Sequence, residues 1–551
     1  MESKRVKKRL EYLDKSLERL VIFFLALLIL LIFPINLVQF AVVACYRKFV
    51  ITLARIFKRK TLAKPLSIQS SMAANMDAMY KSSTFSIIAP VILQGVPDIE
   101  HIRQVIKVKL LEKIDPKTGK WFYPELLQNI SYWWGYAFWT KLDKITPTRF
   151  IQECVHFYKN DDKMQCDFQQ LEDITRELCF KPYSKDKPLV EFILIPKFIP
   201  DLEKQWSQDS TDDKKYFVLI LRIHHSVADG YAILRLFENL SISSSSDAFD
   251  YLKPHDYTQQ RNANSLSFTI KIAKYIALGF KMIYQVSEYM CKSMLYCSEG
   301  SLWDWPAKRP TSPKLWNAVP VAELPMKRYQ NYKTSWGRLF YLSEINDIKK
   351  IHGVSGTAVM YAAILGSIRQ NMFAGSKTIP PYMSFAVTLP LPRKSDKLRN
   401  FTALMTMFVP LGESDPIKRL HKMQQHLDIM KRSTLPVAAT LLTNGVMGLV
   451  PRAFASLVDE TAKLTESAIL SNMAGPKKFY DLAGYPVRDT FWATGQIIDR
   501  NCVFMNIFSG GGKARLAVMG HAGLIESDQK AQNFIDSFFQ ELEIMKTSQQ
   551  S

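Results

Sequence analysis

Cysteine is scarce in this sequence, and no two cysteines have the spacing of a metal or redox pair. The chain has seven, an odd number, at Cys45, Cys154, Cys166, Cys179, Cys291, Cys297 and Cys502. Disulfide frameworks and zinc sites need paired cysteines at regular spacings. Because that pattern is missing, we expect free thiols in a reducing compartment.

Signatures of nucleic-acid binding are also missing, although the chain is strongly basic. Its formal net charge is +21, which favours an anionic partner. The lysines and arginines are scattered, and there is no zinc-ligand spacing, homeodomain-like helix or RNA-recognition signature. The expected partner is therefore anionic lipid or a phosphorylated substrate, and not nucleic acid.

The length excludes a single compact core. The chain has 551 residues, of which 47% are hydrophobic and 22% charged, and this composition is typical of folded domains. Two domains with attachments are expected. We predict a basic cytosolic segment at 1–19, a membrane segment with a basic flank at 20–60, a first lobe at 65–250, a linker at 251–315 and a second lobe at 316–551.

One stretch, residues 20–44, has no charged side chain. It reads LVIFFLALLILLIFPINLVQFAVVA, with Asn36 and Gln39 as its only strongly polar residues. A helix of this length can cross a bilayer, whereas a core helix would show amphipathic periodicity. A cleaved signal peptide fits less well, because the apolar run is long and acidic residues occur in the charged region before it.

Both flanks of this stretch are basic. Positive charge marks the cytosolic side of a membrane, and Pro34 in the middle removes a helical hydrogen bond. A bent hairpin that enters and leaves on the cytosolic face satisfies both features and is favoured over a single kinked span. The flanking residues are Lys4, Arg5, Lys7, Lys8, Arg9, Lys15 and Arg19 before the stretch, and Arg47, Lys48, Arg55, Lys58, Arg59, Lys60 and Lys64 after it.

Strand and helix patterns alternate through both halves of the remaining chain, which indicates α/β or α+β layers. Strands are predicted at 85–93, 188–195, 216–223, 337–342, 382–389, 402–409, 468–473, 489–494, 503–508 and 514–519. Helices are predicted at 98–114, 231–240, 266–298, 355–373, 416–431 and 528–545.

The predicted helix at 266–298 is apolar except for one narrow stripe of lysines. The stripe consists of Lys271, Lys274, Lys281 and Lys292. Such a helix can lie on a membrane with its lysines toward lipid headgroups. A linker packed against both domains is the favoured role, and the two roles are compatible.

The motif that carries chemistry is His224-His225-x-x-x-Asp229-Gly230, between a predicted strand and a predicted helix. An imidazole can take the proton of an alcohol as the alcohol attacks a thioester. Asp229 can hold the loop by pairing with a cation, and Gly230 permits a tight turn or close packing. A turn whose polar groups are all hydrogen-bonded, or a pair of histidine metal ligands, would explain fewer of these features. We therefore predict His225 to be a general base that needs no metal.

The segment HHSVADG at 224–230 resembles the HHxxxDG motif of the CoA-dependent acyltransferase superfamily. Within it, three other segments are similar to the wax ester synthase/diacylglycerol acyltransferase family. They are KPLVE at 187–191, GVSGTAVMYAAILGSIR at 353–369 and SNMAGP at 471–476, the last followed by Ala483-Gly484. Together they cover most of the chain.

This resemblance implies two chloramphenicol-acetyltransferase-like lobes with the site in a tunnel between them. It implies that acyl-CoA is a substrate, that no cofactor is bound, and that a long-chain alcohol or diacylglycerol accepts the acyl group to give wax ester or triacylglycerol. By position, His225 matches the catalytic histidine, and His224, Asp229 and Gly230 match its supporting residues. Asn472 is a candidate for substrate binding.

Some positions depart from the family pattern. Its ND pair is Ser355-Gly356 or Gly356-Thr357 here, and its PLW tryptophan is Val190. Other acceptors (a sterol, a small alcohol or an amine) stay open, as does a catalytically inactive membrane protein that binds lipid. The membrane segment suggests a eukaryotic member on the cytosolic face of the endoplasmic reticulum, with the lipid droplet and plasma membrane as alternatives.

Overall fold

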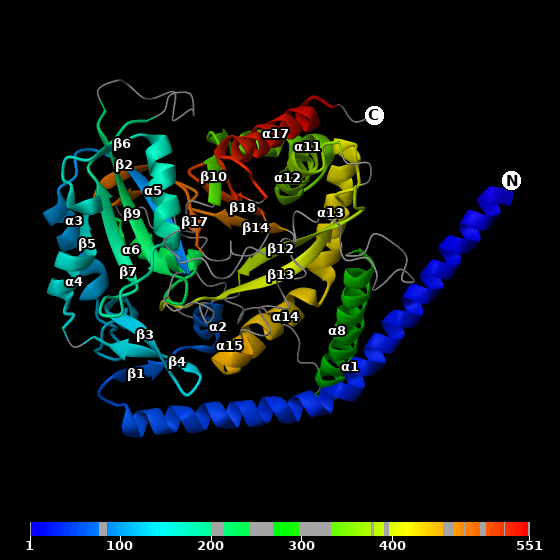
Figure 1. Ribbon diagram of the computed structural model, residues 1–551, viewed down its shortest axis with the longest axis horizontal. Coiled ribbons are helices and arrows are strands. Elements are labelled where there is room, and N and C mark those ends of the chain that lie inside the picture. Colours follow the sequence, from blue (N-terminus) through cyan, green and yellow to red (C-terminus); the bar gives the residue numbers. More distant parts are fainter. Residues whose placement is uncertain are drawn as a thin grey trace.

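Two seven-stranded sheets, one in each lobe, form the body of the protein (Figure 1). The computed structural model describes residues 2–76, 85–142, 144–200, 214–242, 268–296, 332–375, 379–390, 396–455, 468–478, 480–495, 503–522 and 524–548. Helices pack against both sheets, so the prediction of a two-lobed α/β fold is confirmed.

The first lobe is organised around two strands that pair along their whole length, β2 (Ser86–Gln94) and β9 (Tyr216–His224). The sheet has the order β15-β16-β2-β9-β7-β5, in which β15 (Asp481–Leu482) and β16 (Tyr485–Thr490) come from the second half of the chain. Its other first-lobe strands are β7 (Val190–Ile195) and β5 (Val155–Phe157). All of β9 is buried, as expected for a strand covered on both faces.

Helices and short strands complete the first lobe. They are β1 (Leu62–Pro65), α2 (Ile68–Met76), α3 (Ile99–Ile106), η1 (Lys107–Leu111), η2 (Pro124–Leu127), β3 (Gln128–Trp133), β4 (Tyr136–Lys141), α4 (Pro147–Cys154), η3 (Tyr158–Asn160), β6 (Gln165–Cys166), α5 (Phe168–Phe180), β8 (Lys197–Phe198) and α6 (Gly230–Leu240). As predicted, Asp98 caps the helix that follows it, because its carboxylate accepts from the N–H groups of Glu100 and His101.

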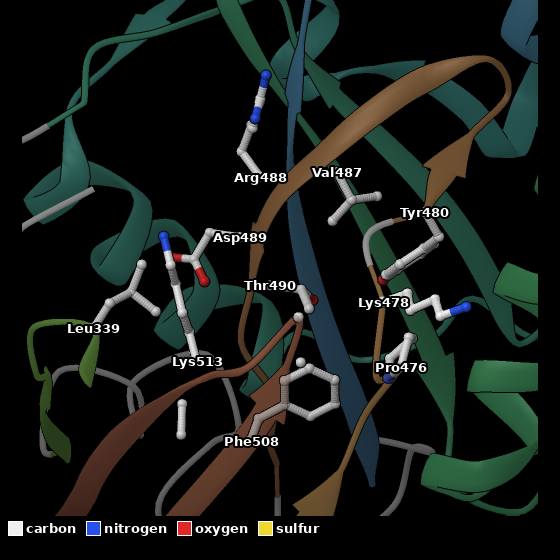
Figure 2. Close-up of a pocket in the computed structure, with 13 residues that line it drawn as sticks. Leu339, Pro476, Lys478, Tyr480, Val487, Arg488, Asp489, Thr490, Phe508 and Lys513 are labelled. Carbon is white, nitrogen blue, oxygen red and sulfur yellow. The ribbon is translucent and has the colours of Figure 1, made fainter. Parts of the chain in front are cut away.

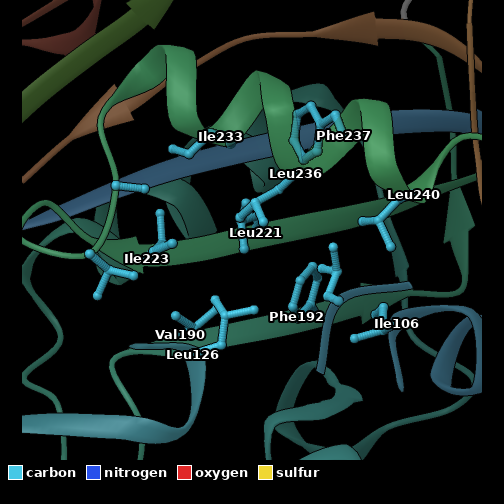
Figure 3. Packing of buried hydrophobic residues seen from close by; sticks show 14 of the residues in the cluster. Ile106, Leu126, Val190, Phe192, Leu221, Ile223, Ile233, Leu236, Phe237 and Leu240 are labelled. Atoms are coloured by element: carbon cyan, nitrogen blue, oxygen red, sulfur yellow. The ribbon is translucent and has the colours of Figure 1, made fainter. Parts of the chain in front are cut away.

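The apolar core of this lobe lies directly behind the end of β9 (Figure 3). Leu221 and Ile223 of β9 pack with Val190 and Phe192 of β7 and with Leu236 of α6. Burying each such side chain stabilises the fold by about 1.5–3 kcal/mol. The strand end from which the histidine motif emerges is therefore held firmly.

The second lobe has the strand order β10-β19-β18-β14-β12-β13, with β11 pairing to β19. Its strands are β10 (Tyr332–Trp336), β11 (Phe340–Tyr341), β12 (Met383–Pro390), β13 (Thr402–Val409), β14 (Ala468–Ala474), β18 (Val503–Gly510) and β19 (Lys513–His521). Its helices are α11 (Leu342–His352), α12 (Gly356–Met372), α13 (Pro416–Arg432), α14 (Leu435–Thr440), η7 (Leu441–Val446), α15 (Met447–Leu449) and α17 (Asp528–Thr547).

The predicted strand at 337–342 is present only as the two-residue strand β11. Strand β10 ends at Trp336, and only Phe340 and Tyr341 pair again. Gly337 separates the two because helix α17 passes close by: a Cβ on Gly337 would lie 2.7 Å from Ile535. The other predicted strands of this lobe all contain a strand, within a few residues at each end.

One segment crosses from the second half of the chain into the first lobe. Strands β15 (Asp481–Leu482), β16 (Tyr485–Thr490) and β17 (Ala493–Thr494) extend the first sheet, and Val487 and Ala493 are in register with Leu93 and Ile88 of β2. This segment lies within 316–551, the range predicted for the second lobe. The exchange interlocks the two lobes beside the histidine motif.

The N-terminal segment is one continuous helix, α1 (Glu2–Phe57), with Pro34 inside it. The predicted hairpin is therefore wrong. A single proline removes one N–H donor, which a long apolar helix can tolerate. Within the described residues, Ser16–Phe57 is the one unbroken helix long and apolar enough to cross a membrane.

The predicted lysine-striped helix is present as α8 (Phe268–Tyr296). It packs between α1 and the second lobe (Figure 1). The Gln285 side chain accepts hydrogen bonds from the backbone N–H and hydroxyl of Thr434, and the Tyr289 ring lies 5.2 Å from the Phe408 ring. Most of the predicted linker lies outside the described residues, and contact of its lysines with lipid stays a prediction.

The described cysteines are all free thiols, as predicted. They are Cys45, Cys154, Cys166, Cys179 and Cys291. The remaining two, Cys297 and Cys502, lie outside the described residues.

A buried ion pair in the second lobe gives the first testable prediction. Arg419 of α13 pairs with Glu541 of α17, and both side chains are almost fully buried. Replacing Glu541 with alanine leaves a buried guanidinium without its carboxylate, so we expect Glu541→Ala to lower the free energy of unfolding by about 3–5 kcal/mol. Glu543 is exposed on the same helix, and Glu543→Ala should change the free energy of unfolding by less than about 0.5 kcal/mol. Equal denaturant midpoints for the two variants would contradict the prediction.

Candidate active site

The histidine motif forms a tight loop at the end of β9. The backbone N–H of His225 donates to the carbonyl of Phe85 at 2.8 Å, and the His225 ring stacks on the Phe85 ring with centroids 4.6 Å apart. Within the loop, the N–H of Val227 donates to the carbonyl of His224 at 2.9 Å. These contacts hold the His225 ring in one orientation.

The His225 ring opens on a cavity between the two lobes. The cavity has a volume of about 80 Å³ and opens to solvent. First-lobe elements and the exchanged segment supply Ile87, His225, Gly230, Tyr231, Trp492 and Thr494, and the second lobe supplies Thr388, Thr402, Ser471, Asn472, Met473, Phe504, Asn506 and Phe508. The predicted position of the site between the lobes agrees with this cavity.

The environment of His225 favours its neutral form. Burial lowers the pKa of the imidazole to about 4, although the negative charge of Asp229 acts in the opposite direction. Within the described part of the chain, the Nδ1 atom of His225 makes no hydrogen bond with another residue. A neutral imidazole can accept a proton at physiological pH.

His224 has a different environment. Its side chain is fully buried and is not among the residues that line the cavity. Its Nδ1 accepts from the N–H of Ser226 at 3.1 Å, and its ring meets the Tyr183 ring edge to face. These contacts indicate that His224 shapes the loop and does not contact substrate.

Asp229 connects the motif to both lobes. One carboxylate oxygen accepts from the N–H of Ala232 at 2.9 Å and caps helix α6. The other accepts from the N–H of Phe401 at 2.7 Å and from the hydroxyl of Thr402 at 3.3 Å, at the start of β13. These partners are neutral, and a cation partner for Asp229 stays a prediction.

Gly230 is needed because the second lobe approaches it closely. A Cβ at this position would lie 2.3 Å from the sulfur of Met473 and 3.1 Å from the Trp492 ring. Of the two predicted roles, the structure supports close packing. A side chain here would occupy the cavity beside His225.

Asn472 lines the same cavity as His225. It lies on β14, which runs parallel to β12 and β18 in the middle of the second sheet. The segment SNMAGP, singled out in the sequence, therefore reaches the site across the gap between the lobes.

Several lining residues were missed by the sequence analysis. Asn506 donates to the carbonyl of Trp492 at 2.7 Å, and the Trp492 ring stacks on Phe508 at 5.2 Å. Asn506 is a lone amide in an otherwise apolar strand, which was an available signal. Trp492 and Phe508 carried none, because aromatic residues are equally common in ordinary cores.

The altered ND position keeps a structural role. Ser355 caps helix α12 by accepting from the N–H of Ala358, and its own N–H and hydroxyl both donate to Gln424 at 2.8 Å. Serine and asparagine cap helices about equally well. The departure from the family pattern thus leaves this helix start intact.

A second cavity, of about 40 Å³ and open to solvent, shares Phe508 with the first (Figure 2). Its charged lining residues are Lys478, Arg488, Lys513 and Asp489. Asp489 is already paired with the buried Arg515 at 2.6 Å. The lining is therefore positive on balance and suits an anionic ligand.

No cluster suited to a metal ion is present in the described ranges. No group of three or more His, Cys, Asp or Glu side chains lies close enough together there to hold one.

Solved structures of two-lobed acyltransferases share this fold. The wax ester synthase/diacylglycerol acyltransferase from Marinobacter aquaeolei VT8 is 14% identical, with a TM-score of 0.52 over 88% of this chain and 100% of that chain. The trichothecene 15-O-acetyltransferase TRI3 from Fusarium sporotrichioides is 10% identical, with a TM-score of 0.54 over 88% and 94%. No curated protein matches the chain in sequence.

The C-terminal part of the chain matches a family model. Residues 399–546 match the family model of the WS/DGAT C-terminal domain. The second lobe therefore carries a wax ester synthase/diacylglycerol acyltransferase domain, and the resemblance seen in the sequence is confirmed. Together, the domain and the fold support an acyltransferase.

The contact at Gly230 gives a second prediction. We expect Gly230→Ala to lower kcat/KM for acyl transfer at least about tenfold, because its methyl group pushes Met473 and Trp492 into the cavity and displaces substrate. Thermal stability should change little, since the end of a methionine side chain can move. Activity and melting temperature should be measured on the same preparations.

The control is to give the new methyl group room. Adding Met473→Ala to Gly230→Ala should restore part of the lost activity, whereas Met473→Ala alone should not raise activity. A double variant no more active than Gly230→Ala would contradict a steric role for Gly230.

Proposed function

We propose that this protein is an O-acyltransferase that moves a fatty acyl group from acyl-CoA to a long-chain alcohol or diacylglycerol. The observation that carries the proposal is the position of His225 on the cavity between the lobes, which the segment containing Asn472 also lines. The products would be wax ester or triacylglycerol. The WS/DGAT C-terminal domain supports this substrate class.

His225 would act as the general base. The acceptor hydroxyl gives its proton to the imidazole while its oxygen attacks the thioester carbonyl. The tetrahedral intermediate then expels the CoA thiolate as the C–S bond breaks, and the thiolate takes the proton back from the imidazolium. The negative charge of Asp229 offsets part of the lowering of the His225 pKa by burial. The same charge stabilises the imidazolium during the step. Asn472, which lines the same cavity, would donate to the developing oxyanion.

The second cavity supports acyl-CoA as the donor. Its balance of positive charge suits the phosphates of CoA, and Phe508 is the side chain that it shares with the His225 cavity (Figure 2). The starter condensation domain of rhizomide synthetase RzmA, which shares the fold at 9% identity with a TM-score of 0.50 over 91% of this chain and 98% of that chain, was solved in complex with C8-CoA.

A lipid acceptor is supported by the cavity and by the anchor. Aromatic and aliphatic side chains, among them Ile87, Trp492 and Phe508, line much of the cavity. The apolar helix α1 would hold the enzyme at a membrane, where such acceptors are dissolved. We propose the cytosolic face of the endoplasmic reticulum as the location, with the lipid droplet and plasma membrane as alternatives.

Activity with and without His225 tests the proposal. Wild type and His225→Ala, expressed in a host that lacks neutral-lipid synthesis, should be given labelled acyl-CoA with fatty alcohol or diacylglycerol. We expect wild type to form ester and His225→Ala to lose about 10²–10⁴-fold in rate. His156→Ala, a substitution at a histidine outside the cavity, should keep its activity.

Other results of this assay would contradict the base, change the acceptor or favour a protein without activity. An active His225→Ala variant would contradict the proposed base. Activity with a sterol, a small alcohol or an amine alone would keep the mechanism and change the acceptor. No ester with any acceptor would favour an inactive lipid-binding protein.

The lowered pKa of His225 predicts the pH dependence. Because burial favours the neutral imidazole in the folded protein, the base stays active as the pH falls below 6.5, the usual histidine pKa, and is protonated only near pH 4. We expect kcat/KM to be constant from about pH 8 down to about pH 5.5. Circular dichroism at each pH should confirm that the protein is folded. An acid limb centred near pH 6.5 would contradict the assigned environment of His225.

A further inference from the structure

The C-terminal end of helix α1 is fixed to the first lobe. Val50 and Ala54 are buried against Tyr136 and Phe138 of strand β4. The guanidinium of Arg47 donates to the carbonyl of Leu66 at 2.8 Å. This end of the helix therefore lies on the globular body.

The other end of the apolar stretch is fixed to the same body through α8. Ile22 is only 4% exposed, and the thiol of Cys291 on α8 lies 3.9 Å from the backbone carbonyl of Glu18. Helix α8 is in turn attached to the second lobe, where Gln285 holds Thr434 and Lys281 donates to a backbone carbonyl of α13.

These two attachments conflict with a helix that crosses the bilayer. Glu18 and Arg47 are about 44 Å apart along a helix with a rise of about 1.5 Å per residue, and the hydrocarbon core of a bilayer is about 30 Å thick. A crossing helix would carry the Glu18 contact to the opposite side of the membrane. Both contacts, however, are made with one folded body that carries many charges and cannot enter the hydrocarbon.

We infer that α1 lies in the plane of the membrane, with its apolar middle embedded in the lipid and both basic flanks on the same face. The inference rests on the membrane attachment that forms part of the proposed function. Residues between the two attachments are open to the surroundings: Phe23, Phe24, Leu31, Ile35 and Val38 are each 57–65% exposed. Lipid is the partner that such a surface requires.

The charges beside the apolar stretch agree with this placement. Arg19 lies before it, and Lys48, Arg55 and Lys58 lie after it. Basic side chains on both sides of an in-plane helix can contact anionic headgroups of one leaflet. The equal charge of the two flanks, which the sequence analysis explained by a hairpin, is thereby explained by a straight helix.

Other exposed apolar side chains lie on elements near α1. Short helices α14, η7 and α15 lie on the side of the second lobe that faces α1, and α15 contacts it (Figure 1). Their exposed side chains include Val437, Leu441 and Leu442, and Phe454 follows shortly after them. This surface would rest on the same leaflet.

The experiment uses the full-length protein in sealed membrane vesicles whose cytosolic face is outward. Epitope tags at the two termini report sidedness, and Glu18→Cys reports the contact with α8 through a disulfide to the native Cys291. We expect protease to remove both tags without detergent, and copper-phenanthroline oxidation to join the introduced thiol to Cys291. Glu18→Cys combined with Cys291→Ser is the matched control and should not form this disulfide.

Two outcomes would overturn the inference. Protection of the N-terminal tag means that α1 crosses the bilayer. Removal of both tags without the disulfide means that α1 does not run straight to α8, as in a hairpin. Ester synthesis assayed in the same vesicles keeps this result separate from the proposed function, because a crossing helix with normal activity would overturn only the orientation.

Discussion

Asp229 accepts hydrogen bonds from both lobes at once, and the geometry of the site depends on these bonds. One oxygen begins helix α6 in the first lobe, and the other holds the backbone at Phe401 and the hydroxyl of Thr402 in the second. The residue lies four positions after His225, so the same loop that presents the base also sets the separation of the lobes. Together with the exchanged segment, these bonds hold the two lobes that line the cavity.

The burial that shapes the cavity also sets the charge of its base. A His225 ring that is stacked on Phe85 and buried away from water is costly to protonate, which keeps it neutral and available. The same burial would oppose the imidazolium formed during the reaction. The negative charge of Asp229 offsets part of that cost without occupying the ring, because its oxygens are engaged by backbone and hydroxyl donors. The motif therefore balances two opposite requirements within one loop.

Local pattern was enough to predict the motif and most of the elements, because β9 is a continuous β-branched and apolar run and α6 follows it with a clear cap. Contacts between distant segments were not predictable in this way. Nothing local to Trp492 says that its segment joins the first sheet, and nothing local to Gly337 says that Ile535 passes over it. The prediction of a hairpin failed for a similar reason. Equal positive charge on both flanks indicates only that both ends lie on the same side of the membrane, and a straight helix held at both ends meets that condition equally well.

An anchor in the plane of the membrane has a consequence for substrate supply. A crossing helix would leave the body free to turn about one tether, whereas attachments at both ends of α1 fix the orientation of both lobes relative to the lipid. Because α14, η7 and α15 lie on the side facing α1, the second lobe would meet the leaflet with an apolar surface. An acceptor dissolved in that leaflet would then reach the protein in a constant orientation, while acyl-CoA would arrive from the aqueous side at the positively charged cavity.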